Sequence, residues 1–150
     1  MRSDSGPFAE LASQLLRKGA PLRIKARGGS MIPFILDGDV VLVAPGGNSE
    51  IVVGDVICYE ISPGRLFLHR VIKRDGERFV IKGDALTFTD LISPGQVLGK
   101  VVAIERRGRM RRLDTARWRN RATAFLSPLL PPLLSPAIRL RRMWKAALRG

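Results

Sequence analysis

The sequence has little of the chemistry that builds covalent cross-links or metal sites. It contains one cysteine, Cys58, and one histidine, His69. A single cysteine excludes an intramolecular disulfide and a cysteine zinc site, and one histidine leaves little scope for a histidine-based metal centre. We therefore expect no metal and no cofactor. Cys58 lies in the apolar run DVICYEI, which predicts a small buried hydrophobic residue.

Long hydrophobic runs are also missing. No stretch reaches the roughly 18–20 uninterrupted apolar residues of a membrane-spanning helix. The nearest, residues 122–138, has no charge but contains four prolines. The N-terminus carries acids and has no apolar core that would mark a secretory signal. The sequence therefore predicts neither a transmembrane anchor nor a cleavable signal, and a protein that is peripherally membrane-associated or cytoplasmic.

Acidic residues are almost absent from the end of the chain. The net charge is +13 over 150 residues, but residues 1–105 hold 13 Lys and Arg against 12 Asp and Glu, a net of +1. Residues 106–150 hold 13 basic residues and one acid, Asp114, a net of +12. Such asymmetry predicts parts with different tasks. We expect an N-terminal helical segment over 1–20, a domain over 21–105 and a basic, proline-interrupted tail over 106–150.

The domain is predicted to be mostly β. Residues 8–18 have apolar side chains at helical spacing and end before Gly19, which predicts one short amphipathic helix. Valine- and isoleucine-rich runs bounded by turn residues predict strands, at residues 21–26, 40–44, 55–61, 66–74, 78–82 and 96–106. The tetrapeptide RDGE, residues 74–77, is typical of a hairpin turn. Many short strands with tight turns indicate a coiled β-barrel or paired sheets. Basic amphipathic helices are predicted in the tail, the first over 106–126.

The stretch RGGSMIPFILDGDVVLV, residues 27–43, contains the strongest candidate for chemistry. Gly28 and Gly29 allow unusual backbone dihedral angles. Ser30 can then be presented with backbone N–H groups beside it, as an oxyanion hole requires. Taken alone, the same residues also fit an ordinary turn.

A serine hydroxyl is a weak nucleophile unless a base takes its proton. Three residues are candidate bases: His69, Lys73 and Lys82. An unperturbed histidine has a pKa of about 6.5, whereas that of a lysine, near 10.4, must fall by several units through burial. His69 therefore needs the least help, although a lone histidine in a strand also fits a structural role. Asp84, in the turn-like sequence IKGDA, is a candidate to orient the base.

Four motifs in order resemble the type I signal peptidase family: GGSMIPFILDGDVVLV, VGDVICYE, LHRVI and IKGDA. The resemblance covers about residues 22–105, within the superfamily that also contains the self-cleaving SOS repressors. His69 stands where bacterial enzymes have lysine, which is the mark of the archaeal, endoplasmic-reticulum and spore-former type.

The resemblance implies a β-rich serine endopeptidase that cleaves signal or leader peptides after small residues. Ser30 would attack the peptide carbonyl, His69 would act as base and then acid, and Asp84 would orient His69. The other implied site residues are Gly28, Gly29, Met31 and Pro33 for oxyanion and substrate binding, and Asp39 and Arg70 in support.

Two features depart from the family pattern. Gly28 occupies a position that usually carries a hydroxyl residue, and the loss of one oxyanion donor costs on the order of 10²–10³ in rate. The sequence also predicts no N-terminal anchor of the kind that the family usually has. The tail, with its basic residues, Trp118 and Trp144, predicts binding to an anionic membrane surface instead. Its leucine–proline stretch makes nucleic acid a less favoured partner.

Two other functions fit the same sequence. A self-cleaving repressor would need a DNA-binding domain before residue 21 and a lysine base. A non-catalytic binding module that keeps the fold without the activity is the second alternative, and Gly28 favours it.

Overall fold

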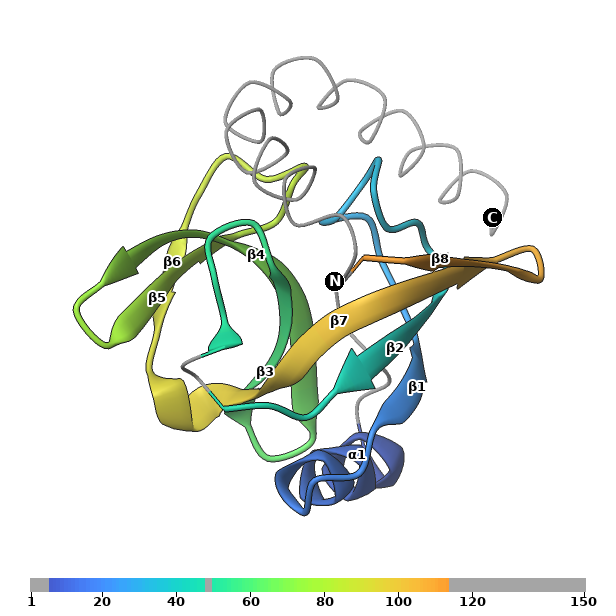
Figure 1. Ribbon diagram of the computed structural model, residues 1–150, viewed down its shortest axis with the longest axis horizontal. Helices are drawn as coiled ribbons and strands as arrows, with labels where there is room; N and C mark the ends of the chain where they lie inside the picture. Colours follow the sequence, from blue (N-terminus) through green and yellow to red (C-terminus); the bar gives the residue numbers. More distant parts are fainter. Residues whose placement is uncertain (1–5, 48–49, 114–150) are drawn as a thin grey trace, which may run out of the picture.

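The computed structural model describes residues 6–47 and 50–113 and shows one helix against an antiparallel β-sheet (Figure 1). Helix α1 spans Pro7–Arg17. The strands are β1 (Leu22–Lys25), β2 (Val40–Ala44), β3 (Val56–Ser62), β4 (Arg65–Asp75), β5 (Arg78–Lys82), β6 (Asp90–Ile92), β7 (Val97–Arg106) and β8 (Arg109–Arg112). A short 3₁₀ helix, η2 (Pro94–Gln96), precedes β7. The predicted class, mostly β with a short N-terminal helix, is confirmed.

Helix α1 ends where the sequence predicts. Gly19 has a φ of 87°, which favours glycine. The Gly19 and Ala20 N–H groups donate to the carbonyls of Leu16 and Leu15, the pattern of a Schellman motif. One face of the helix buries Ala9, Ala12 and Leu16 against the sheet, because apolar residues recur at helical spacing.

The sheet order is β1-β2-β7-β3-β4-β5-β6, with β8 paired to the outer part of β7. Within the described residues β1 and β6 are its two edges and do not pair with each other, so the sheet is open rather than a closed barrel. In Figure 1 it curls strongly, so that β5 and β6 lie on one side of the molecule and β1 and β2 on the other.

Strand β3 is buried on both faces, and this divides the interior into two cores. Val56 and Cys58 point into the first core, which contains α1, Met31, Ile35 and the Leu66 and Leu68 side chains of β4. Ile57 and Tyr59 point into the second, with Val71, Phe79 and Ile81. Successive strand residues alternate between faces, so the run VICY serves both cores. The expectation that Cys58 is buried is confirmed, and burial raises its thiol pKa to about 12.

Two elements differ from the sequence prediction. Strand β6 follows a turn-rich segment and was not predicted. The predicted basic helix over 106–126 is wrong in its first part, because β7 continues to Arg106 and residues 109–112 pair with it as β8. Gly108 has a φ of 75° and makes the tight turn between these strands. The remainder of the predicted tail helices and the Trp118 and Trp144 positions lie outside the described residues.

No helix in the described part of the chain is long and apolar enough to cross a membrane.

Candidate functional site

Ser30 lies on a loop between β1 and β2, residues 27–39, which we call the serine loop. Backbone hydrogen bonds close its base: the Ala26 N–H donates to the Asp39 carbonyl at 2.8 Å, and the Gly38 N–H donates to the Ala26 carbonyl at 2.9 Å. Within the loop the Gly28 N–H donates to the Asp37 Oδ1 at 2.9 Å. Gly28 has a φ of 95°, so a side chain at this position would be strained. The glycine in place of a hydroxyl residue therefore matches a backbone need.

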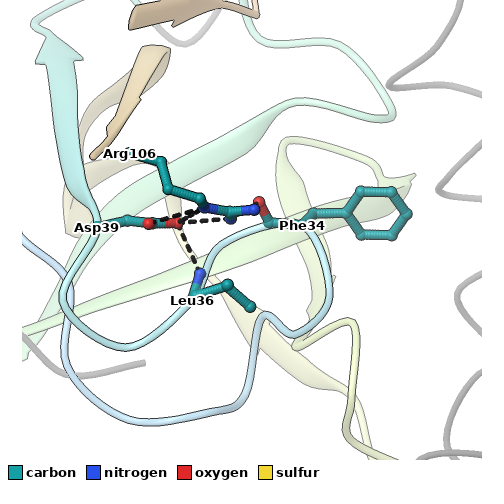
Figure 2. Close-up of polar contacts among 4 residues, drawn as sticks. All are labelled: Phe34, Leu36, Asp39 and Arg106. Atoms are coloured by element: carbon teal, nitrogen blue, oxygen red, sulfur yellow. Dashed lines mark hydrogen bonds and ion pairs between the residues drawn. The ribbon is translucent and has the colours of Figure 1, made fainter. Parts of the chain in front are cut away.

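An ion pair fastens the serine loop at its end next to β2 (Figure 2). The Arg106 Nη2 and Nε donate to the Asp39 carboxylate, the closest contact being 2.7 Å, and Nη2 also donates to the Phe34 carbonyl at 3.1 Å. Asp39 Oδ2, the oxygen that accepts from Arg106 Nη2, also accepts the Leu36 N–H at 2.8 Å. Burial alone would raise the pKa of Asp39, but the hydrogen bonds from Arg106 and Leu36 outweigh it and lower that pKa. Asp39, predicted as a supporting residue, thus fixes the shape of the loop.

The serine loop docks on the segment that follows β5. The Ala85 N–H donates to the Ser30 carbonyl at 2.9 Å. Gly83 lies so close that a Cβ on it would stand 2.7 Å from the Ser30 carbonyl oxygen and 2.8 Å from Leu86 Cδ1. Only glycine fits there without displacing the serine backbone. The IKGDA motif is therefore the seat of the loop that carries Ser30.

A buried ion pair holds this seat in place. Arg70 Nε and Nη2 donate to the two Asp84 oxygens at 2.8 and 2.7 Å, and Arg70 Nη1 donates to the Gly54 carbonyl at 2.8 Å. Both side chains are almost wholly inaccessible, with 3% and 0% exposed. The Arg70 guanidinium also stacks on the Phe34 ring of the serine loop, 5.3 Å from its centroid. Each of the three guanidinium nitrogens thus donates a hydrogen bond, and the bidentate pair with Asp84 compensates the burial of the charge.

The contacts of Asp84 differ from its predicted role. We expected its carboxylate to orient His69, but both of its oxygens accept from Arg70. His69 instead has its Nδ1 3.0 Å from the Tyr59 hydroxyl. Arg70, predicted as a supporting residue, forms the pair that organises the site.

His69 lies beside Tyr59 of the second core. It is 5% exposed and pairs with Ile57 in the β3–β4 ladder. The Tyr59 hydroxyl is buried beside it, and a buried O–H needs an acceptor. If Tyr59 donates to Nδ1, then Nε2 carries the proton of the neutral ring. Burial lowers the pKa of His69 to about 3 and raises the pKa of Tyr59 above its ordinary value.

Lys82 is the last residue of β5, directly before the segment on which the serine loop docks. It is 4% exposed and lies directly opposite Arg70 in the β4–β5 ladder. Burial lowers the pKa of its amine, against the attraction of the Asp84 carboxylate, which raises it. The third basic candidate, Lys73, is exposed on the outer part of β4.

The other predicted site residues lie on the serine loop. Met31 is fully buried in the first core and Pro33 is exposed. A Cβ on Gly29 would meet the Ile32 side chain at 3.2 Å. Their predicted part in binding an oxyanion or a substrate stays a prediction.

The fold and this seat define a class: a small, open antiparallel β domain that presents a serine loop over the end of the β4–β5 hairpin. A protein-family model described as Peptidase S24-like matches residues 6–102, and the chain belongs to this family. Searches of curated protein sequences and of solved structures each returned no significant match. The family confirms the superfamily of signal peptidases and SOS repressors that the motifs predicted.

Proposed function

We propose that this chain is a serine endopeptidase whose nucleophile is Ser30. The observation that carries the proposal is the seat of the serine loop within a Peptidase S24-like domain. Ser30 is half-buried, its carbonyl is held by Ala85, and its loop is fastened by the Asp39–Arg106 and Arg70–Asp84 pairs. A nucleophile held this firmly is preorganised for attack on a substrate carbonyl.

In the proposed reaction Ser30 Oγ attacks a peptide carbonyl and forms an acyl-enzyme ester as the amine leaves. The Ser30 N–H is proposed to stabilise the oxyanion. Water then hydrolyses the ester and restores the serine. Following the resemblance to signal peptidases, the proposed substrates are signal or leader peptides with small residues before the cleaved bond.

The experiment is cleavage of such a peptide together with labelling by a fluorophosphonate, which reacts with activated serines. We expect the wild-type chain to cleave the peptide and to carry the label on Ser30, and Ser30→Ala to lose both. A matched control is Ser93→Ala, at an exposed serine outside the loop, which should behave as wild type. Full activity of Ser30→Ala would refute the proposal.

A second candidate is a repressor-like binding module without peptidase activity. The position of His69 favours it, because the base implied by the resemblance is buried and hydrogen-bonded to Tyr59. This candidate predicts an intact fold with no labelling of Ser30 at any pH, so the same probe separates the two functions.

A further inference from the structure

Lys82 and His69 lie on opposite faces of the β4–β5 hairpin. In an antiparallel ladder, residues directly opposite each other share a face and neighbours along a strand alternate. Lys82 is paired with Arg70, so both point to the face of the Arg70–Asp84 pair. His69 points the other way, toward Ile57, Tyr59 and the second core.

The serine loop lies on the Lys82 face. Met31 and Ile35 of the loop belong to the first core, which also contains Leu66 and Leu68, the β4 residues that share the face of Arg70. Phe34 stacks on the Arg70 guanidinium.

The contact of the serine loop with the end of β5 also places the loop on the face of Lys82. The Ser30 carbonyl is against Gly83, the residue directly after Lys82, and is hydrogen-bonded to Ala85. Lys82 therefore projects from the segment that seats Ser30, and its flexible four-carbon stem suits it to reach a neighbouring hydroxyl.

We propose that Lys82, rather than His69, is the general base for Ser30; this rests on the proposed function of Ser30 as nucleophile. The neutral Lys82 amine takes the Ser30 Oγ proton as Oγ bonds to the substrate carbonyl carbon. The resulting ammonium returns that proton to the departing amine when the C–N bond breaks. The amine then takes a proton from water, whose oxygen attacks the ester, and returns it to Ser30 Oγ as the acyl group leaves.

The surroundings of Lys82 suit a lysine that is neutral during the reaction. Its charged neighbours on that face include Arg70 and Asp84, which neutralise each other in the bidentate pair. Asp90 of β6 pairs with Ile81, whose side chain enters the second core, and so faces away from Lys82. Of the charged residues of the serine loop, Arg27 and Asp37 are exposed, and Asp39 is buried in its ion pair with Arg106.

His69 contributes differently in this scheme. When Nδ1 accepts from Tyr59, Nε2 carries the proton of the neutral ring, and no ring nitrogen is then left to take the Ser30 proton. His69 is a structural residue that gives the buried Tyr59 hydroxyl an acceptor.

The test measures the rate of Ser30 labelling by a fluorophosphonate across pH for the full-length chain and three variants: Lys82→Met, Lys82→Arg and His69→Gln. Arginine keeps the charge and the donors of lysine but does not release its proton. We expect both Lys82 variants to lose labelling on the order of 10²–10⁴-fold, the usual range for a general base. His69→Gln keeps an acceptor for Tyr59 and should label close to the wild-type rate.

A second measurement does not depend on activity. In an NMR titration with ¹⁵N-labelled lysine, the Lys82 signal is the one absent from the spectrum of Lys82→Arg. We expect its midpoint below the ordinary lysine value of about 10.4 and matching the rise of wild-type labelling with pH. Circular dichroism and urea midpoints establish whether the variants are folded. If Lys82→Met does not fold, the titration of the wild-type chain still tests the proposal.

The outcomes separate this proposal from the proposed function. Loss of labelling in Ser30→Ala, with wild-type rates in both Lys82 variants, would overturn only the assignment of Lys82. Wild-type rates in Lys82→Arg alone, or an ordinary titration midpoint, would also overturn it. Absence of labelling in the wild-type chain would overturn the proposed function and the base together.

Discussion

The buried Arg70–Asp84 pair gives the sharpest test of how the seat of the serine loop is held. The perturbation is Asp84→Asn, which keeps the size of the side chain and removes its charge. Arg70 would then remain buried, with 3% of its side chain exposed and no carboxylate partner. Its Nη1 would keep the Gly54 carbonyl, while Nε and Nη2 would share at most one amide oxygen.

Breaking a buried pair by removing one partner costs about 3–5 kcal/mol. A small domain has a free energy of unfolding of roughly 5–15 kcal/mol, so we expect a folded but much weakened Asp84→Asn variant. The double variant Arg70→Met, Asp84→Asn removes the orphaned charge as well. We expect it to be more stable than the sum of the two single changes predicts, because the two sites are in direct contact.

The assay is urea unfolding of the wild-type chain, the two single variants and the double variant at neutral pH. The matched control is Asp75→Asn, which breaks the exposed Asp75–Arg78 pair, whose side chains are 55% and 54% accessible. Exposed pairs contribute about 0–1 kcal/mol. A loss below about 1 kcal/mol for Asp84→Asn, or additive effects of the two single changes, would refute the reasoning.

Two further predictions concern Gly83 and His69. Gly83→Ala places a Cβ 2.7 Å from the Ser30 carbonyl oxygen, so we expect a loss of about 1–3 kcal/mol in unfolding free energy and slower labelling of Ser30. Gly95→Ala is the control, because its added Cβ meets nothing within 4 Å. Equal stability and equal labelling rates of the two variants would contradict the close contact between Gly83 and the Ser30 carbonyl. His69 has a pKa of about 3 in the folded chain against about 6.5 when unfolded, so the unfolded state binds its proton first as the pH falls. Its contribution is complete above pH 6.5 and should decline by about 1.4 kcal/mol per pH unit toward pH 3. The unfolding free energy, measured in urea at pH 7, 5.5 and 4.5, should fall with this slope in wild type relative to His69→Gln. The same pH dependence in both chains would disprove the prediction.

Much of the fold was predictable because local signals and tertiary structure agree. The helix ends at Gly19 because glycine readily takes the required φ, and that preference can be recognised in one residue. The RDGE turn joins β4 to β5 as expected, with Gly76 at a φ of 60°. Strand β6 and strand β8 were missed because neither has an apolar pattern of its own. β8 is Arg-Met-Arg-Arg with all four residues exposed, and it is a strand only because β7 supplies a hydrogen-bonding edge.

The candidate site, like the fold, was predictable from the sequence only where local signals decide the structure. The sequence by itself determined the serine loop: its two glycines, Ser30 and the Gly-Asp turn are close in the chain, and their backbone needs follow from residue type. It also determined the superfamily, because the motifs occur in a fixed order. Only the tertiary structure decided which face of β4 carries each side chain and which carboxylate meets which base. Burial and strand register are properties of the packed sheet and cannot be derived from local sequence. They explain why Asp84 pairs with Arg70, why His69 contacts Tyr59, and why Lys82 lies next to the segment that seats Ser30.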